Sequence, residues 1–106
     1  MSGVLYLDCK AADRAFCARL AADFERLARV KVVRGFAGPD SAMAARVTVA
    51  KSGAASADAL LEAGVLKAGA LQPAQRQTLR IDVADASFGA GSATALVYPL
   101  TKLLGL

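Results

Sequence analysis

The side chains that most often carry out catalysis are scarce in this sequence. None of its 106 residues is a histidine, and its two cysteines are Cys9 and Cys17. Without histidine there can be no Ser-His-Asp or Cys-His arrangement and no histidine general base. Two cysteines without histidine cannot complete the tetrahedral ligand shell of a structural zinc ion. We therefore expect no catalytic residue, no metal site and no cofactor, in a protein that is not an enzyme.

The two cysteines are expected to be reduced thiols. If both lie on or beside one helix, their separation in the chain places them about 12 Å apart along its axis. A disulfide requires Cα atoms within roughly 7 Å, so the pair is predicted not to bridge within one molecule. Cys17 is expected to be a half-buried core residue, as free cysteine usually is. Reduced thiols are typical of a cytosol-like compartment.

Three other patterns could bind a ligand, but each has a simpler interpretation. Residues 89–92 (GAGS) follow a predicted strand, and their amides could hold an anion. This stretch lacks the Walker lysine and the dinucleotide fingerprint, so a flexible loop is favoured. Asp8 could be a lone acid or a magnesium ligand, although capping the following helix is the better role. Asp82 and Asp85 are close in sequence, but strand alternation disfavours their facing one metal.

The composition describes a small basic protein with an aliphatic core. The hydrophobic fraction is 56% and the aromatic fraction only 6%, so the core must be built from Val, Leu and Ala. Net charge is +4, but the thirteen basic residues are scattered, unlike those of a dedicated nucleic-acid binder. We expect a single α/β domain over residues 1–106, with its core at 3–84, a linker at 85–92 and a C-terminal tail at 93–106.

The strongest pattern is an amphipathic helix over residues 11–29. Its bulky apolar residues recur at spacings of four, four and three, which places them on one helix face: Phe16, Leu20, Phe24 and Leu27. The smaller residues that widen this stripe are Cys17, Ala21 and Ala28. We expect the stripe to cover one face of a sheet.

Four strands and a second helix are predicted around this helix. The strands are expected at residues 4–7, 30–36, 45–50 and 78–83. The second helix is expected to begin after Ser56 and to run through Leu66. The order β-α-β-β-α-β is that of a ferredoxin-like, two-layer α+β sandwich, with both helices on one face of an antiparallel sheet. The other face is expected to be open, with these outward side chains: Arg46, Thr48, Arg80 and Asp82.

The apolar tail allows two interpretations. As a single helix it aligns Ala93, Leu96, Leu100, Leu103 and Leu104 on one side. Pro99 would remove a backbone hydrogen bond from that helix and push Tyr98 out of the α region. The slightly favoured alternative is an extra edge strand over residues 94–98, followed by a short helix with Pro99 at its first position.

Two features bear on location. The N-terminal segment MSGVLYLDCK has no basic region and only a short apolar run, and no stretch approaches the ~20 apolar residues of a membrane-spanning helix. The segments LARVKVVRGFAG and ALVYPLTKLLGL look like parts of small tailed-phage virion proteins. This resemblance implies a small structural component of a larger particle. We expect a cytoplasmic or virion-associated protein that does not enter membranes.

These patterns favour a non-enzymatic protein–protein interaction or assembly module, either a homo-oligomer or one bound to a protein partner. A small domain with an apolar tail commonly covers it by association. The expected contact residues are Leu96, Tyr98, Leu100, Leu103 and Leu104. The alternative is a small-ligand or nucleic-acid binding domain that uses the basic open sheet face. Nucleic acid is the less favoured partner, because Tyr6 is the only aromatic residue on the first strand and residues 45–50 contain none.

Overall fold

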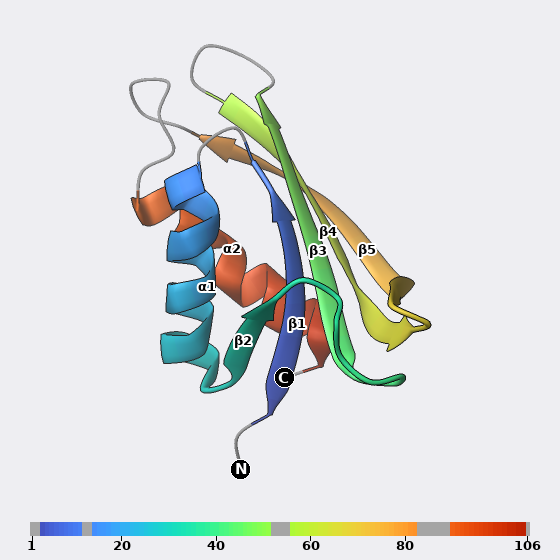
Figure 1. The fold of residues 1–106 in the computed structure, drawn as a ribbon. Coiled ribbons are helices and arrows are strands. Elements are labelled where there is room, and N and C mark those ends of the chain that lie inside the picture. Colours follow the sequence, from blue (N-terminus) through green and yellow to red (C-terminus); the bar gives the residue numbers. More distant parts are fainter. Residues whose placement is uncertain (1–2, 12–13, 52–55, 83–89, 106) are drawn as a thin grey trace.

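The computed structural model describes residues 3–11, 14–51, 56–82 and 90–105. Five strands and two helices follow one another along this part of the chain (Figure 1). In order they are β1 (Val4–Lys10), α1 (Arg14–Ala28), β2 (Lys31–Arg34), β3 (Met43–Lys51), β4 (Ser56–Lys67), β5 (Ala70–Asp82) and α2 (Ala90–Leu104).

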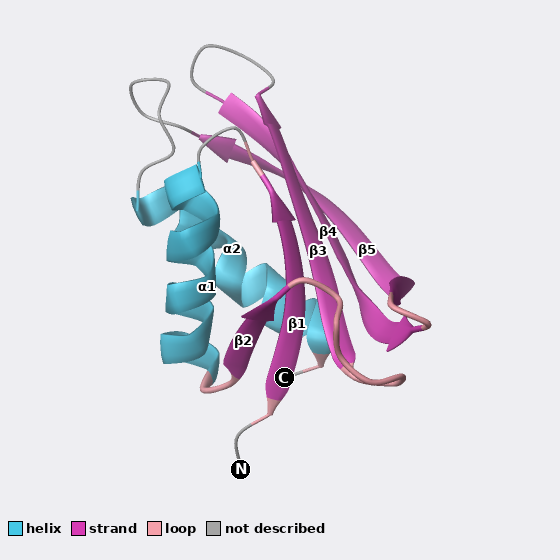
Figure 2. Cartoon of the chain, in the orientation of Figure 1, coloured by secondary structure: helices cyan, strands magenta, loops and turns pink. Residues whose placement is uncertain are grey.

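The strands form one mixed sheet in the order β2-β1-β3-β4-β5. β1 is parallel to both of its neighbours, β2 and β3, whereas β3, β4 and β5 form an antiparallel meander. Both helices lie on the same side of this sheet (Figures 1 and 2). The predicted ferredoxin-like order is therefore wrong, because four strands follow α1 in succession and the second helix comes last.

The segment predicted as the second helix is strand β4. Its odd-numbered residues from 57 to 63 face the helices and are buried, as strand alternation requires: Ala57, Ala59, Leu61 and Ala63. β4 pairs with β3 on one side and with β5 on the other. Both of its edges are thus hydrogen-bonded, and these ladders outweigh the helix propensity of its Ala and Leu residues.

A tight turn joins β4 to β5, which starts well before the predicted strand at residues 78–83. The turn residues Ala68 and Gly69 have φ angles of 53° and 77°, the conformation of a two-residue type I′ hairpin turn. An Asp40 carboxylate oxygen accepts a hydrogen bond of 2.9 Å from the Ala68 amide and holds this turn from outside the hairpin. Further along, the register shifts between Ala63 and Gly64. A Cβ at Gly64 would overlap the backbone carbonyl of Gln72, so this bulge requires glycine.

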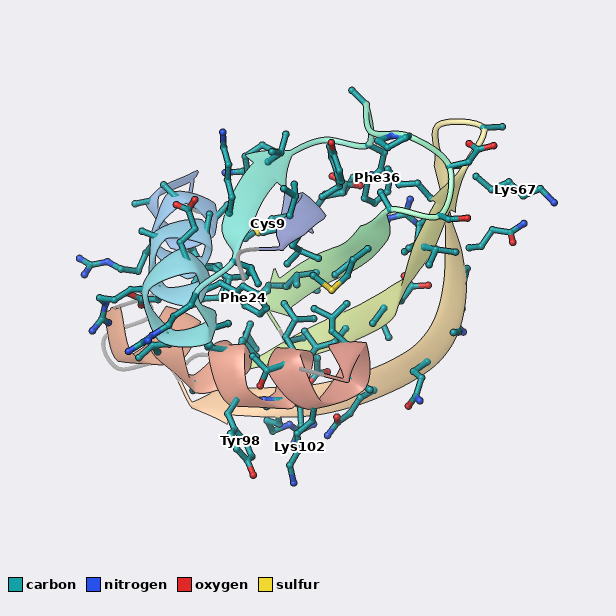
Figure 3. All side chains as sticks on the ribbon, turned by 90° about the horizontal axis from the view of Figure 1, so that it is seen from below. Cys9, Phe24, Phe36, Lys67, Tyr98 and Lys102 are labelled. Carbon is teal, nitrogen blue, oxygen red and sulfur yellow. A yellow bond between two sulfur atoms is a disulfide. The ribbon has the colours of Figure 1, made fainter. Side chains whose placement is uncertain are left out.

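The core lies between the sheet and the helices. As predicted, Phe16, Leu20 and Phe24 of α1 are buried, and Phe24 points into the interior in Figure 3. They belong to one cluster with Leu5 and Leu7 of β1 and with buried residues of β3 and β4. The prediction for Leu27 is wrong: its exposed fraction is 51%, because it stands in the last turn of α1 beside a surface groove.

The tail forms one helix, α2, so the favoured strand-then-helix interpretation is wrong. The helix begins at Ala90, inside the stretch predicted as a linker, and residues 83–89 lie outside the described chain. Pro99 sits within it and cannot donate a hydrogen bond to the carbonyl of Ala95. Ala95 is exposed, so water can satisfy that carbonyl.

Cys9 and Cys17 are joined by a disulfide, contrary to the prediction of two free thiols. The prediction assumed that both residues lie on or beside one helix. Instead Cys9 lies in β1, and the chain reverses before α1 brings Cys17 back beside it, with a Cα–Cα distance of 5.8 Å. A separation of eight residues that includes a reversal is well within disulfide reach.

Candidate functional site

The residues predicted to form a contact surface in the tail are divided by the fold. Leu96 and Leu100 are fully buried in the core, where they stabilise the fold and are not available to a partner. Leu103 and Leu104 are partly buried against the same core, and they line a hollow of about 360 Å³ with Met43 and other residues. Tyr98 alone among the five is mostly exposed, at 66%. Of the five predicted contact residues, Tyr98 is thus the one whose side chain is mostly exposed to solvent.

Tyr98 borders a groove between the two helices, which we call the helix groove. Its lining residues are Leu27 from α1 and Val97, Tyr98 and Thr101 from α2, around a volume of about 370 Å³. Val97 is buried and contributes to the wall, while Leu27 and Tyr98 stand exposed at the surface. Figure 3 shows Tyr98 and Lys102 pointing away from the sheet, on the outer side of α2. The helix groove is thus an outward-facing apolar surface.

Two polar side chains at or beside the helix groove, Thr101 and Lys102, contact Tyr98. The Thr101 hydroxyl donates a hydrogen bond of 2.7 Å to the carbonyl oxygen of Tyr98. The Lys102 ammonium lies 4.9 Å from the centre of the Tyr98 ring, which is a cation–π distance. Leu27, Val97 and the Tyr98 ring offer no acid, base or nucleophile other than the phenol. This arrangement suits the docking of an apolar side chain and does not suit catalysis.

Sequence reasoning missed Leu27 and Val97 as members of this groove. Leu27 continues the apolar stripe of α1, and that periodicity indicated burial. Its position next to Ala28, the last residue of α1, is the signal that could have distinguished Leu27 from the buried residues of the stripe. A helix end can extend past the elements that cover the rest of the stripe, and then the final stripe residue faces solvent.

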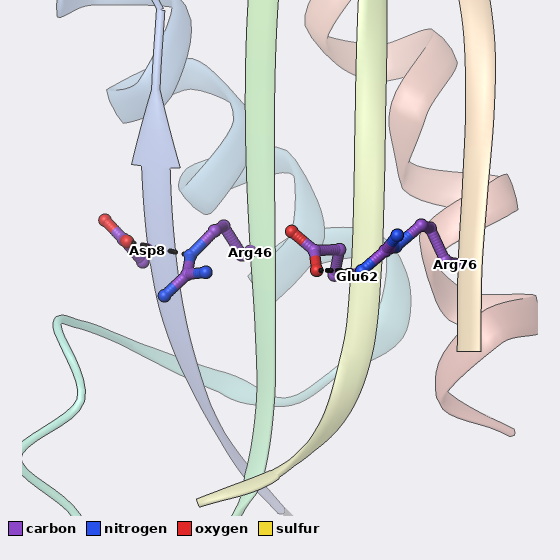
Figure 4. Close-up of polar contacts among 4 residues, drawn as sticks. All are labelled: Asp8, Arg46, Glu62 and Arg76. Carbon is purple, nitrogen blue, oxygen red and sulfur yellow. Dashed lines mark hydrogen bonds and ion pairs between the residues drawn. The ribbon is translucent and has the colours of Figure 1, made fainter. Parts of the chain in front are cut away.

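The sheet face opposite the helices carries a row of alternating charges. Asp8, Arg46, Glu62 and Arg76 are register neighbours on β1, β3, β4 and β5 (Figure 4). Arg46 binds Asp8 and Arg76 binds Glu62, each with a nitrogen–oxygen distance of 3.3 Å. Asp8 therefore does not cap a helix as predicted: it lies within β1 and pairs across the sheet.

The same face is less open and less basic than the sequence suggested. Arg80 is paired with Asp58 at 3.4 Å, so each of the three arginines described on this face has a carboxylate partner. A Cβ on Gly38 would overlap the Tyr6 ring, which shows that the segment after β2 lies directly against that ring. Thr48 is half-buried, and the side chain of Asp82 lies outside the described part of the chain. The face thus presents neutralised charge and a covered aromatic ring.

Within the described residues, no group of three or more cysteine or carboxylate side chains is placed to hold a metal ion. In the same part of the chain, neither helix combines the length and the apolar character needed to span a membrane.

Comparisons with known proteins give a likeness in fold. No protein-family model matches the chain, and no curated protein matches it in sequence. One chain of a PelC dodecamer from Paraburkholderia phytofirmans superposes on this chain with a TM-score of 0.53 at 15% identity. The match covers 97% of this chain and 86% of the PelC chain. The N-terminal domain of Protein Y from Thermus thermophilus covers 96% of this chain and 94% of its own length at 15% identity, with a TM-score of 0.42. The chain therefore shares its overall architecture with PelC.

Proposed function

We propose that the chain is a non-enzymatic assembly module, in which the helix groove docks a second copy of the same chain. The observation that carries this proposal is the pair of large apolar side chains, Leu27 and Tyr98, that are 51% and 66% exposed on either side of one groove. Exposed apolar surface gathered at a hollow is typical of an interaction site, whereas scattered exposed residues are not.

The shape of the groove favours a second copy as the partner. Tyr98 supplies a protruding ring, and the hollow between Leu27 and Val97 supplies a place for such a ring. In a two-fold dimer the same patch meets itself, so each Tyr98 can enter the groove of the other chain. Tyrosine is also one of the residue types that contribute most to binding when buried at an interface. A patch with both features is self-complementary.

The comparison with PelC agrees with this proposal. That protein has the same overall architecture and is described as a dodecamer. A domain of this fold can therefore serve as a subunit of an oligomer. In the present chain the proposed assembly would form a structural component of a larger particle, such as a virion.

Point variants at the helix groove test the proposal. Deleting the tail would remove Leu96 and Leu100 from the core, so deletion would unfold the domain and report nothing about association. Leu27→Asp and Tyr98→Asp instead place charge on two exposed positions. The matched control is Val65→Asp, which changes an apolar residue that is 41% exposed and lines the other hollow, the one beside Leu103 and Leu104.

The measurement is molar mass by light scattering over a concentration series, with circular dichroism to confirm folding. We expect the unmodified chain and Val65→Asp to associate, and each groove variant to weaken association by at least roughly tenfold, the effect of losing one well-buried anchor. A monomeric unmodified chain at every concentration would refute the proposal. Equal association of Leu27→Asp, Tyr98→Asp and the control would also refute it.

A further inference from the structure

The disulfide lies in the wall of an open pocket. This cysteine pocket has a volume of about 510 Å³ and is lined by Cys9, Lys10, Ala11, Cys17 and Arg34. Cys9 is half-buried, whereas Cys17 is only 4% exposed. A small molecule that enters the pocket therefore reaches the disulfide from the side of Cys9.

Two cations line the same pocket. Lys10 and Arg34 are both exposed, and neither has a carboxylate partner among the residues that the structure describes. The arginines on the sheet face differ, because each is paired with a carboxylate. Unpaired cations beside a hollow raise the local concentration of anions. The cysteine pocket thus combines a reachable disulfide with two cationic side chains.

We propose that Cys9–Cys17 is a thiol–disulfide exchange site selective for small thiols that carry carboxylate groups. The incoming thiolate attacks Cys9 Sγ, a new sulfur–sulfur bond forms there, and the bond to Cys17 breaks. The electron pair of the broken bond remains on Cys17 Sγ as a thiolate. A second small thiolate then attacks the small-molecule sulfur of the mixed disulfide. This attack releases a small-molecule disulfide and leaves Cys9 as a thiolate. The two small thiols are oxidised and the protein disulfide is reduced.

The position of Cys17 favours it as the leaving group. It is the fourth residue of α1, so its sulfur belongs to the first turn of the helix, where the backbone amides stabilise negative charge. A more stable leaving thiolate departs faster in disulfide exchange. Cys9 is also less buried than Cys17, so an incoming thiolate reaches the Cys9 sulfur more easily, which favours the same direction of reaction. This site is separate from the helix groove, and it stands or falls independently of the proposed assembly.

The test compares three small thiols of similar size but different charge on the intact, oxidised chain. They are 3-mercaptopropionate (anionic), 2-mercaptoethanol (neutral) and cysteamine (cationic). Rates of mixed-disulfide formation are measured by intact-mass spectrometry after acid quenching and are divided by the concentration of each thiolate. The same thiols reacting with 2-hydroxyethyl disulfide, which is neutral and unstructured, give the intrinsic reactivities. The quantity of interest is the preference for the anionic over the cationic thiol relative to this reference.

We expect that preference to be about tenfold on the chain, the low end of electrostatic enrichment in a charged cleft, and to fall as salt is added. Lys10→Gln and Arg34→Gln should each reduce it, while Lys67→Gln, an exposed lysine at the hairpin end of β4, should leave it unchanged. Peptide mapping should find the first adduct on Cys9. A preference equal to that of the reference disulfide would overturn the proposal, as would a first adduct on Cys17. The salt series uses the unmodified chain, so it tests the electrostatic preference for the anionic thiol even if a variant does not fold.

Discussion

Replacing Arg46 by methionine should destabilise the fold more than replacing Arg80, another arginine of the same sheet face. Arg46 binds Asp8 at 3.3 Å, and its guanidinium lies 5.5 Å from the centre of the Phe36 ring. It is also the register neighbour of Glu62, whose side chain is only 11% exposed. Methionine keeps the apolar stem of arginine but removes both the ion pair with Asp8 and the cation–π contact with Phe36.

The size of the effect follows from these contacts. A partly exposed ion pair contributes about 0.5–1 kcal/mol, and a cation–π contact at the surface contributes about 0.5–1 kcal/mol. Glu62 would lose Arg46 as a neighbouring cation but would keep its ion pair with Arg76. The expected loss of stability is therefore estimated from the Asp8 ion pair and the Phe36 cation–π contact alone. The free energy of unfolding should fall by about 1.5 kcal/mol, which corresponds to a decrease of roughly 6–12 °C in Tm for a domain of this size.

Arg80→Met is the matched control. Arg80 also pairs with a carboxylate, Asp58, but their side chains are 71% and 45% exposed, and the ion pair should contribute at most about 0.5 kcal/mol. Urea unfolding followed by circular dichroism measures both variants, with the disulfide intact. The difference between them should shrink in 1 M salt because the lost contacts are electrostatic. If Arg46→Met and Arg80→Met lose the same stability, the row of alternating charges does not stabilise the sheet and the reasoning fails.

Two further predictions concern packing. Gly64→Ala should lower the free energy of unfolding by at least about 2 kcal/mol, because its Cβ would overlap the Gln72 carbonyl. Gly3→Ala is the control and should change it little, since its Cβ would lie 3.7 Å from Val30. Similar thermal unfolding of the two variants would contradict this prediction. Phe24→Ala should cost about 3–5 kcal/mol in chemical unfolding, and Leu27→Ala less than about 1 kcal/mol at protein concentrations too low for association. Comparable losses would show that exposure at the end of α1 was misjudged.

The elements with clear periodicity were predictable from sequence, and those with mixed signals were not. Residues 45–50 alternate between apolar and polar side chains, and they lie in β3 as expected. β4 fails this test because Leu60 and Leu61 are adjacent and its inward positions are mostly alanine, which favours helices. Only the pairing of β4 with β3 and β5 decides its conformation, and such long-range ladders leave no local pattern.

The candidate sites were harder to predict than the fold, for two physical reasons. The disulfide depends on a chain reversal between β1 and α1, and the distance between Cys9 and Cys17 cannot be derived before that reversal is placed. The helix groove depends on which tail residues turn toward the sheet. Tyr98 and Leu100 have similar apolar character in sequence, yet the rotation of α2 exposes the first and buries the second. Residue type alone does not distinguish them.

The long outer strand β5 has a consequence for solubility. It pairs with β4 on one side, and within the described sheet its other side has no neighbour, so its backbone could template pairing with other chains. Pro73 interrupts this edge because it lacks an amide hydrogen, and the bulge beside Gly64 bends it. The exposed, charged side chains of Arg76 and Arg80 lie along the remainder of the strand. These features act against open-ended fibre growth along β5, and they leave the apolar groove on the helical side as the place where a closed, specific assembly can form.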